Sequence, residues 1–207
     1  MTAQLLYFVD PMCSWCWGFA PVFAQIRQEY AERMSAALIM GGLRPWTKEP
    51  MGEADKAGLA KHWAHVAEAS GQPFDLGFFA RERFIYDTEP AARAVVVAGR
   101  LLGAPAFGFL EAVQRAFYAE NRDVTQVDVL AEIAAEQGLE RGAFAAAFAS
   151  EAAKQETIGH FQTSQRLGVR GFPTLAAVAE DRQAQTLTAG FAPVETVRER
   201  LEAYLEG

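Results

Sequence analysis

Residues 10–19 read DPMCSWCWGF and contain both cysteines of the 207-residue chain, Cys13 and Cys16. The apolar run that precedes them, residues 4–9, is rich in strand-forming side chains and predicts a buried strand. Apolar side chains then recur at helical spacing over residues 12–34 and predict a helix. The two cysteines are therefore expected at the turn between a strand and a helix.

This position suits a redox-active dithiol. At the beginning of a helix, the free backbone N–H groups and the helix dipole favour a thiolate on the first cysteine, so Cys13 is the candidate nucleophile. Cys16, one turn further on, is placed to attack a mixed disulfide and release the product. From the residues alone, half of a zinc site or an incidental pair of cysteines stays open as an alternative.

Composition narrows the class of protein. The chain is 51% hydrophobic and carries a formal net charge of −7, which describes a folded domain and argues against nucleic acid or an anionic membrane as partner. Two cysteines three residues apart do not make a structural disulfide framework. A zinc site needs further ligands, and His62 and His65 lack thiol or acidic partners at fitting spacing, so no metal and no cofactor are expected. No apolar run is long enough to cross a bilayer, and a secretory leader is not recognisable, so a cytoplasmic location is expected.

The rest of the chain divides into three parts. Residues 37–40 predict a second strand, and Pro21 should kink the preceding helix because it cannot donate a hydrogen bond to the carbonyl of Trp17. The middle of the chain, residues 45–149, has helical periodicity throughout and no convincing strand. The last part predicts a helix, two strands and a helix over residues 150–167, 169–178, 185–189 and 193–205.

The second signal is Gly171-Phe172-Pro173 at the entrance of a predicted strand. A proline that follows a bulky residue there is a candidate cis peptide, although a trans proline is the more frequent outcome for such a sequence.

Taken together, the stretch at residues 10–19, the helical middle and the late segment at residues 169–174 resemble the DsbA-like thioredoxin family, its FrnE-like cytosolic branch in particular. The resemblance implies an α/β thioredoxin fold with a large all-helical insertion. Residues 1–44 and 150–207 would form a discontinuous thioredoxin-like domain, and residues 45–149 would form the insertion. The implied function is a thiol–disulfide oxidoreductase, either a reductase or an isomerase.

The resemblance also implies the site. Cys13 would be the attacking thiol and Cys16 the resolving thiol, and Pro173 would be a cis-proline facing them. Ser14, Trp15, Phe172 and Pro173 would contact the substrate, with the Phe172 backbone pairing with an extended segment. Protein disulfides and small thiols, glutathione among them, are the implied partners of a monomer or homodimer.

Two positions depart from the family pattern. Many thioredoxin-fold enzymes keep a buried acid six residues before the first cysteine, where this chain has Tyr7, and Asp10 is the nearest acid. DsbA itself has a histidine before its second cysteine, where this chain has the uncharged Trp15. A thiolate stabilised mainly by helix-end N–H groups is expected.

Two other functions stay open. Kappa glutathione transferases and hydroxychromene carboxylate isomerases share the fold and the insertion, but that group carries a serine where Cys13 stands. A binding module without enzymatic activity is the third possibility.

Overall fold

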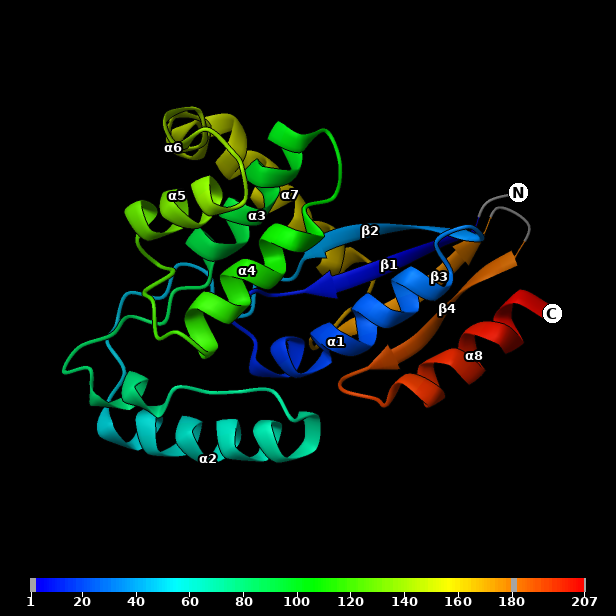
Figure 1. Ribbon diagram of the computed structural model, residues 1–207, viewed down its shortest axis with the longest axis horizontal. Helices are drawn as coiled ribbons and strands as arrows, with labels where there is room; N and C mark the ends of the chain where they lie inside the picture. The colour runs from blue at the N-terminus through cyan, green and yellow to red at the C-terminus, as the bar shows by residue number, and fades with distance from the viewer. Residues whose placement is uncertain (1–2, 180–181, 207) are drawn as a thin grey trace.

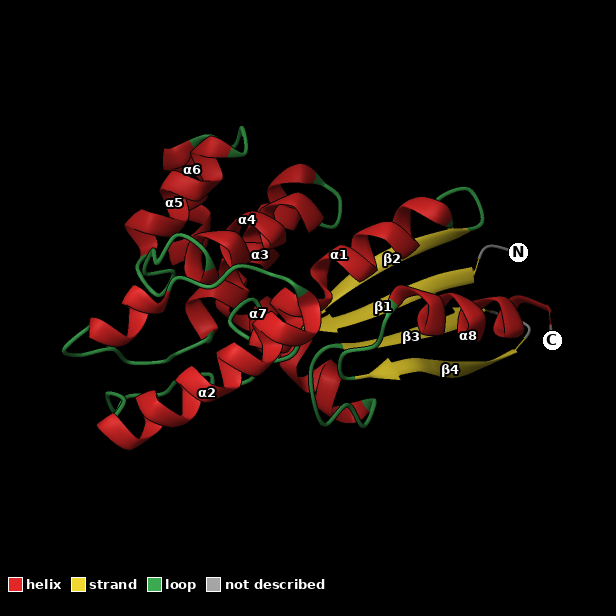
Figure 2. Ribbon diagram, turned by 60° about the horizontal axis from the view of Figure 1, so that its bottom comes forward, coloured by secondary structure: helices red, strands yellow, loops and turns green. Residues whose placement is uncertain are grey.

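The computed structural model of the chain describes residues 3–179 and 182–206. Its single described sheet has the strand order β2-β1-β3-β4. β1 and β2 are parallel, whereas β3 is antiparallel to both β1 and β4. Figure 2 shows that the first two and last two strands lie side by side, although more than half of the chain separates them in sequence. The strands are β1 (Ala3–Val9), β2 (Met34–Met40), β3 (Thr174–Ala179) and β4 (Arg182–Ala189).

Helices surround this sheet and extend from one end of it. In Figure 1, α1 and α8 cover the nearer face of the sheet, α7 passes behind it beside β2, and the remaining helices lie beyond the sheet, away from both termini. The helices are α1 (Ser14–Glu29), α2 (Glu53–Ser70), the short 3-10 helix η1 (Leu76–Ala80), α3 (Glu89–Leu102), α4 (Phe107–Tyr118), α5 (Val127–Glu136), α6 (Arg141–Ala149), α7 (Glu151–Arg166) and α8 (Val194–Glu206).

The α/β thioredoxin fold predicted from the sequence is confirmed. Residues 45–149, which are described throughout, contain helices and no strand. The division into a discontinuous domain and an insertion stays a prediction. The strand expected at residues 169–178 begins only at Thr174, and residues 171–173 form a bend before it. The peptide bond between Phe172 and Pro173 is cis.

The predicted interruption of α1 has a specific structural consequence. Pro21 cannot donate to the carbonyl of Trp17, and the side-chain amide of Gln72 donates to that oxygen instead, at 3.0 Å. The indole N–H of Trp17 in turn donates to the carbonyl of Pro73, also at 3.0 Å. This reciprocal pair of bonds joins α1 to the segment that follows α2.

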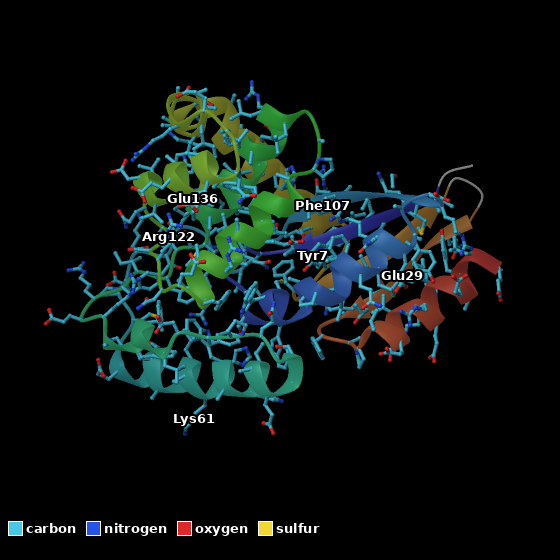
Figure 3. The ribbon with its side chains drawn as sticks, in the orientation of Figure 1. Tyr7, Glu29, Lys61, Phe107, Arg122 and Glu136 are labelled. Carbon is cyan, nitrogen blue, oxygen red and sulfur yellow. The ribbon has the colours of Figure 1, made fainter. Side chains whose placement is uncertain are left out.

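Aromatic side chains fix the helices around α1. Trp63 of α2 is fully buried, with ring centroids 4.9 Å from Phe78 and 5.1 Å from Tyr118. Figure 3 labels Tyr7 on β1 and Phe107 at the beginning of α4, which are joined through Phe23 of α1, whose ring lies 4.1 Å from Tyr7 and 5.5 Å from Phe107. The sheet, α1, α2 and α4 thus form one packed unit around the cysteine motif.

In the described part of the chain, no helix combines the length and apolar character that crossing a membrane requires.

Candidate active site

Cys13 is the N-cap residue of α1. Its sulfur makes no capping hydrogen bond to the first turn, so that the N–H groups there are not satisfied by this side chain. The side chain is nearly buried, at 7% exposed, and its Sγ donates a hydrogen bond to the carbonyl oxygen of Phe172 at 3.4 Å. A group at this position reaches both solvent and the segment before β3.

Cys16 lies one turn further along α1 and is fully buried. The two cysteines lie 3.6 Å apart, and both are free thiols in this structure. Burial raises the pKa of Cys16 well above its ordinary value, and the neighbouring Cys13 raises it further. Cys16 is therefore held as the neutral thiol while Cys13 is the accessible one.

Asp10 holds the loop that carries the motif. Its two carboxylate oxygens accept hydrogen bonds from the backbone N–H groups of Met12, at 2.9 Å, and Leu43, at 2.7 Å. The side chain is fully buried, and this burial raises the pKa of Asp10 to about 6, although the two hydrogen bonds act in the opposite direction. The acid also raises the pKa of Cys16. The structure thus places a buried acid next to the dithiol, three residues before Cys13.

Tyr7 occupies the position where related folds carry an acid, and it is buried. Burial raises the pKa of Tyr7 well above its ordinary value, and Cys16 adds to that effect. The side chain thus stays uncharged at neutral pH, and Asp10 is an acid whose charge affects the pKa of Cys16.

Phe172 faces Cys13 from the approach to β3, and its bond to Pro173 is cis. The Phe172 ring lies against Gly41, which directly follows β2, so that a Cβ added to Gly41 would overlap atoms of the ring. The backbone N–H of Phe172 has no hydrogen-bond partner in the described part of the chain. Phe172 therefore offers a fixed carbonyl to Cys13 and an unpaired backbone donor beside it.

Trp15 is surrounded by side chains from distant parts of the chain. The rings of His62 and His65 on α2 meet it edge-on, with centroids 5.9 and 5.4 Å away, and Phe191 lies 5.7 Å away. Burial lowers the pKa of His62, and the nearby His65 and Arg44 lower it further. The spacing of the two histidines did not suggest this position, because only tertiary packing brings α2 against α1.

A hollow of about 280 Å³ opens beside Cys13. Four of the residues predicted from sequence line it together: Cys13, Ser14, Trp15 and Phe172. The other lining residues were not predicted as site residues, and Arg44, His62 and Tyr86 are among them. Tyr86 is buried and its hydroxyl donates to the carbonyl of Met12 at 2.7 Å, so it fixes the residue before Cys13.

No group of three or more metal-ligating side chains occurs among residues 3–179 and 182–206.

Comparison with known proteins identifies the family. A model of the DSBA-like thioredoxin domain matches residues 4–202. The chain belongs to the DSBA-like thioredoxin domain family. The resemblance seen in residues 10–19 and 169–174 is thereby confirmed, and a DsbA-like thiol–disulfide oxidoreductase fold is established for the chain.

Solved structures agree with this assignment. A protein from Nitrosomonas europaea described as a candidate protein disulfide isomerase is 38% identical, with a TM-score of 0.91 over 100% of this chain and 98% of that one. The cytosolic disulfide reductase DsbM from Pseudomonas aeruginosa is 30% identical, with a TM-score of 0.78 over 98% of both chains. A second structure of DsbM contains glutathione. This DsbA-like chain matches that structure with a TM-score of 0.77.

Curated relatives carry a different description. The ClpXP adapter protein SpxH of Shouchella clausii is 25% identical over 179 residues, which cover 83% of this chain and 56% of that protein. The SpxH of Bacillus subtilis matches at 25% identity over 83% of this chain and 57% of its own length. The DsbA-like chain thus spans less than two thirds of these relatives.

Proposed function

We propose that this protein is a dithiol reductase or isomerase that acts on protein disulfides and small disulfides through Cys13 and Cys16. The observation that carries the proposal is the contrast between the two thiols. Cys13 caps α1 and is slightly exposed, whereas Cys16 is fully buried with a raised pKa. That contrast suits one attacking and one resolving thiol.

The reaction proceeds in two exchanges. The Cys13 thiolate attacks one sulfur of a substrate disulfide, so that a Cys13–substrate disulfide forms and the other substrate sulfur leaves as a thiolate. Cys16 then loses its proton and attacks the sulfur of Cys13, which releases the second substrate thiolate and leaves the Cys13–Cys16 disulfide. The substrate gains two electrons, and the protein loses two.

Asp10 is the proposed acceptor of the Cys16 proton. With a pKa of about 6, most of this carboxylate is ionised at neutral pH. Because the pKa lies close to neutral pH, the carboxylate can accept a proton. It is the buried acid whose charge acts on Cys16.

Substrate contact is proposed for the segment opposite the cysteines. The unpaired N–H of Phe172 is suited to an extended peptide, as in other cases where a peptide adds to an open backbone edge. Pro173 follows it, and Ser14 and Trp15 form the other side of the hollow.

The partner that restores the dithiol is proposed to be glutathione, and the location is proposed to be the cytoplasm, where thiols are kept reduced. Both proposals are supported by the similarity to DsbM, described as a cytosolic disulfide reductase and known with glutathione.

Reduction of insulin in the presence of dithiothreitol tests the function. Turnover should be lost in Cys13→Ser. Cys16→Ser should instead accumulate mixed disulfides with substrate, because the resolving thiol is missing. In the native reduced protein, iodoacetamide at pH 7 should modify Cys13 first, as peptide mapping will show. Faster modification of Cys16 would reverse the two roles.

A glutathione conjugation assay run in parallel separates the alternative enzyme class. Conjugation without insulin reduction would assign the protein to the transferase or carboxylate-isomerase type. Absence of both activities in a folded, reduced protein would favour a binding module.

A further inference from the structure

The hollow beside Cys13 adjoins a second one along α2. The second hollow has a volume of about 350 Å³ and includes Ala54, Asp55 and Gly58 from the first turns of α2. Arg44, Leu59 and His62 line both. The space available to a ligand thus begins at the nucleophilic sulfur and continues past Arg44.

Arg44 is the conspicuous charge in this space. Its backbone is fixed by two hydrogen bonds with Thr88, at 3.1 and 3.3 Å, and its guanidinium lies over the ring of Tyr86 at 5.3 Å from the centroid. No carboxylate in the described ranges, 3–179 and 182–206, forms an ion pair with it. By contrast, Arg93 and Arg198 pair with Glu89 and Glu29 within the protein.

An unpaired, positioned guanidinium next to a reactive thiol is suited to a carboxylate on the reacting molecule. The other charged side chain in the adjoining hollow is Asp55, one of whose oxygens accepts the N–H of Gly52 at 3.0 Å. A thiol ligand that carries both carboxylate and ammonium groups fits this arrangement better than a neutral thiol. Glutathione has this chemistry.

We infer that Arg44 binds a carboxylate of glutathione and so selects the thiol that reduces the Cys13–Cys16 disulfide; this inference rests on the proposed function. One glutathione thiolate attacks the sulfur of Cys13, forming a glutathione–Cys13 disulfide and freeing Cys16 as a thiol. A second glutathione thiolate attacks the glutathione sulfur of that mixed disulfide. The products are glutathione disulfide and the reduced dithiol, with two electrons passed to the protein.

The test measures thiol selectivity. The oxidised protein is mixed with glutathione, with its glycyl monoethyl ester or with cysteamine, and the rate of reduction is followed by tryptophan fluorescence. The comparison is the ratio of the second-order rate constants for glutathione and cysteamine. Arg44→Met should lower this ratio about tenfold, the order expected for loss of a charged hydrogen bond in a partly open site. Arg44→Lys should keep part of the selectivity, because it retains the charge without the planar fork.

Arg141→Met is the matched control, since it removes one exposed arginine from α6, far from the motif in Figures 1 and 2. Its ratio should equal that of the wild type. A lower rate for the ester than for glutathione would assign the glycyl carboxylate to Arg44, and equal rates would assign the γ-glutamyl carboxylate. Binding of S-methylglutathione to the reduced protein, measured by calorimetry, should weaken in Arg44→Met by a similar factor.

An unchanged ratio in Arg44→Met would overturn the inference while leaving the oxidoreductase intact. Failure of every thiol to reduce the wild-type disulfide would instead overturn the proposed function, and the inference with it.

Discussion

At the scale of single residues, Asp10 is the group whose burial has the clearest consequence. Its pKa of about 6 lies above the ordinary value of 3.8, so the native state holds a proton over a pH range where the unfolded chain has lost it. The charged carboxylate therefore destabilises the folded protein above pH 6, and this cost is relieved as the pH falls from 6 towards 4.

Asp10→Asn should remove this pH dependence, because the amide does not titrate. The quantity to compare is the free energy of unfolding of Asp10→Asn minus that of the wild type. This difference should be about 2 kcal/mol larger at pH 7 than at pH 4.5. Urea denaturation at both pH values measures it. The same difference at the two pH values would show that Asp10 titrates as an ordinary acid.

Gly41 is the second residue considered, because the structure leaves no room for a side chain at this position. Because the Phe172 ring lies where a Cβ would be, Gly41→Ala should displace that ring and with it the carbonyl that accepts from Cys13. We expect insulin reduction to fall at least about tenfold, since small misplacements at reacting groups cost rates of this order. Gly159→Ala on α7 is the control, because a Cβ there meets nothing within 4 Å and Gly159 lies outside the hollows beside Cys13. Equal activity of the two variants would contradict a positioning role for Gly41.

At the scale of elements, α1 depends on a residue outside itself. Gln72 donates to the carbonyl that Pro21 leaves without its helical partner. Gln72→Ala should lower the free energy of unfolding by about 1 kcal/mol, the usual net value of such a hydrogen bond.

The loss should be smaller in a Pro21→Ala background, where the backbone N–H of residue 21 is available to the Trp17 carbonyl. A double-mutant cycle by chemical denaturation measures this coupling. Gln137→Ala serves as control, because Gln137 lines the same hollow between α1 and α4 as Gln72 and is exposed. If the effects of Gln72→Ala and Pro21→Ala are additive, the Gln72 amide does not replace the backbone donor that is missing at Pro21.

At the scale of the whole molecule, the site lies where the sheet meets the helical part. The motif begins between β1 and α1, and Phe172 lies just before β3. The ring of Trp15 on α1 contacts His62 and His65 on α2. The ion pair between Glu29 and Arg198, 2.9 Å, joins α1 to α8 at the other end, where Figure 3 labels Glu29. The reduction potential is a property of this whole arrangement, because it measures the difference in stability between the oxidised and reduced forms.

We expect a reduction potential of roughly −250 to −180 mV, between those of thioredoxin and DsbA. Trp15 carries no charge, and the lowered pKa of His62 leaves that ring neutral at pH 7, so neither supplies a fixed positive charge to the Cys13 thiolate. The helix N-terminus still stabilises the thiolate, and the Arg44 side chain, which lines the same hollow as Cys13, adds to this effect without the direct contact that a histidine inside the motif makes. Equilibration with glutathione buffers, followed by tryptophan fluorescence, gives the value. A potential near −120 mV would require a further stabilising group at Cys13.

The sequence by itself was enough to predict the family, the fold and the order of the elements. A CxxC between an apolar run and a helical repeat places two thiols at a helix N-terminus, and this depends only on residues near one another in the chain. The helical middle and the final strands and helix follow from the same short-range periodicity. The loss of a helical hydrogen bond at Pro21 could also be predicted without tertiary information, but the replacement donor, Gln72, could not.

Only the tertiary structure decided what surrounds the thiols. Phe172, whose carbonyl accepts from Cys13, is 159 residues from Cys13 in sequence. Tyr86, which donates to the carbonyl of Met12, is 74 residues from Met12. His62, Arg44 and Gly41 carry no local pattern that marks them as parts of a site. The physical reason is that their roles arise from side-chain packing between α2, the loop after β2 and the entrance to β3, whereas periodicity reports only which face of an element is buried.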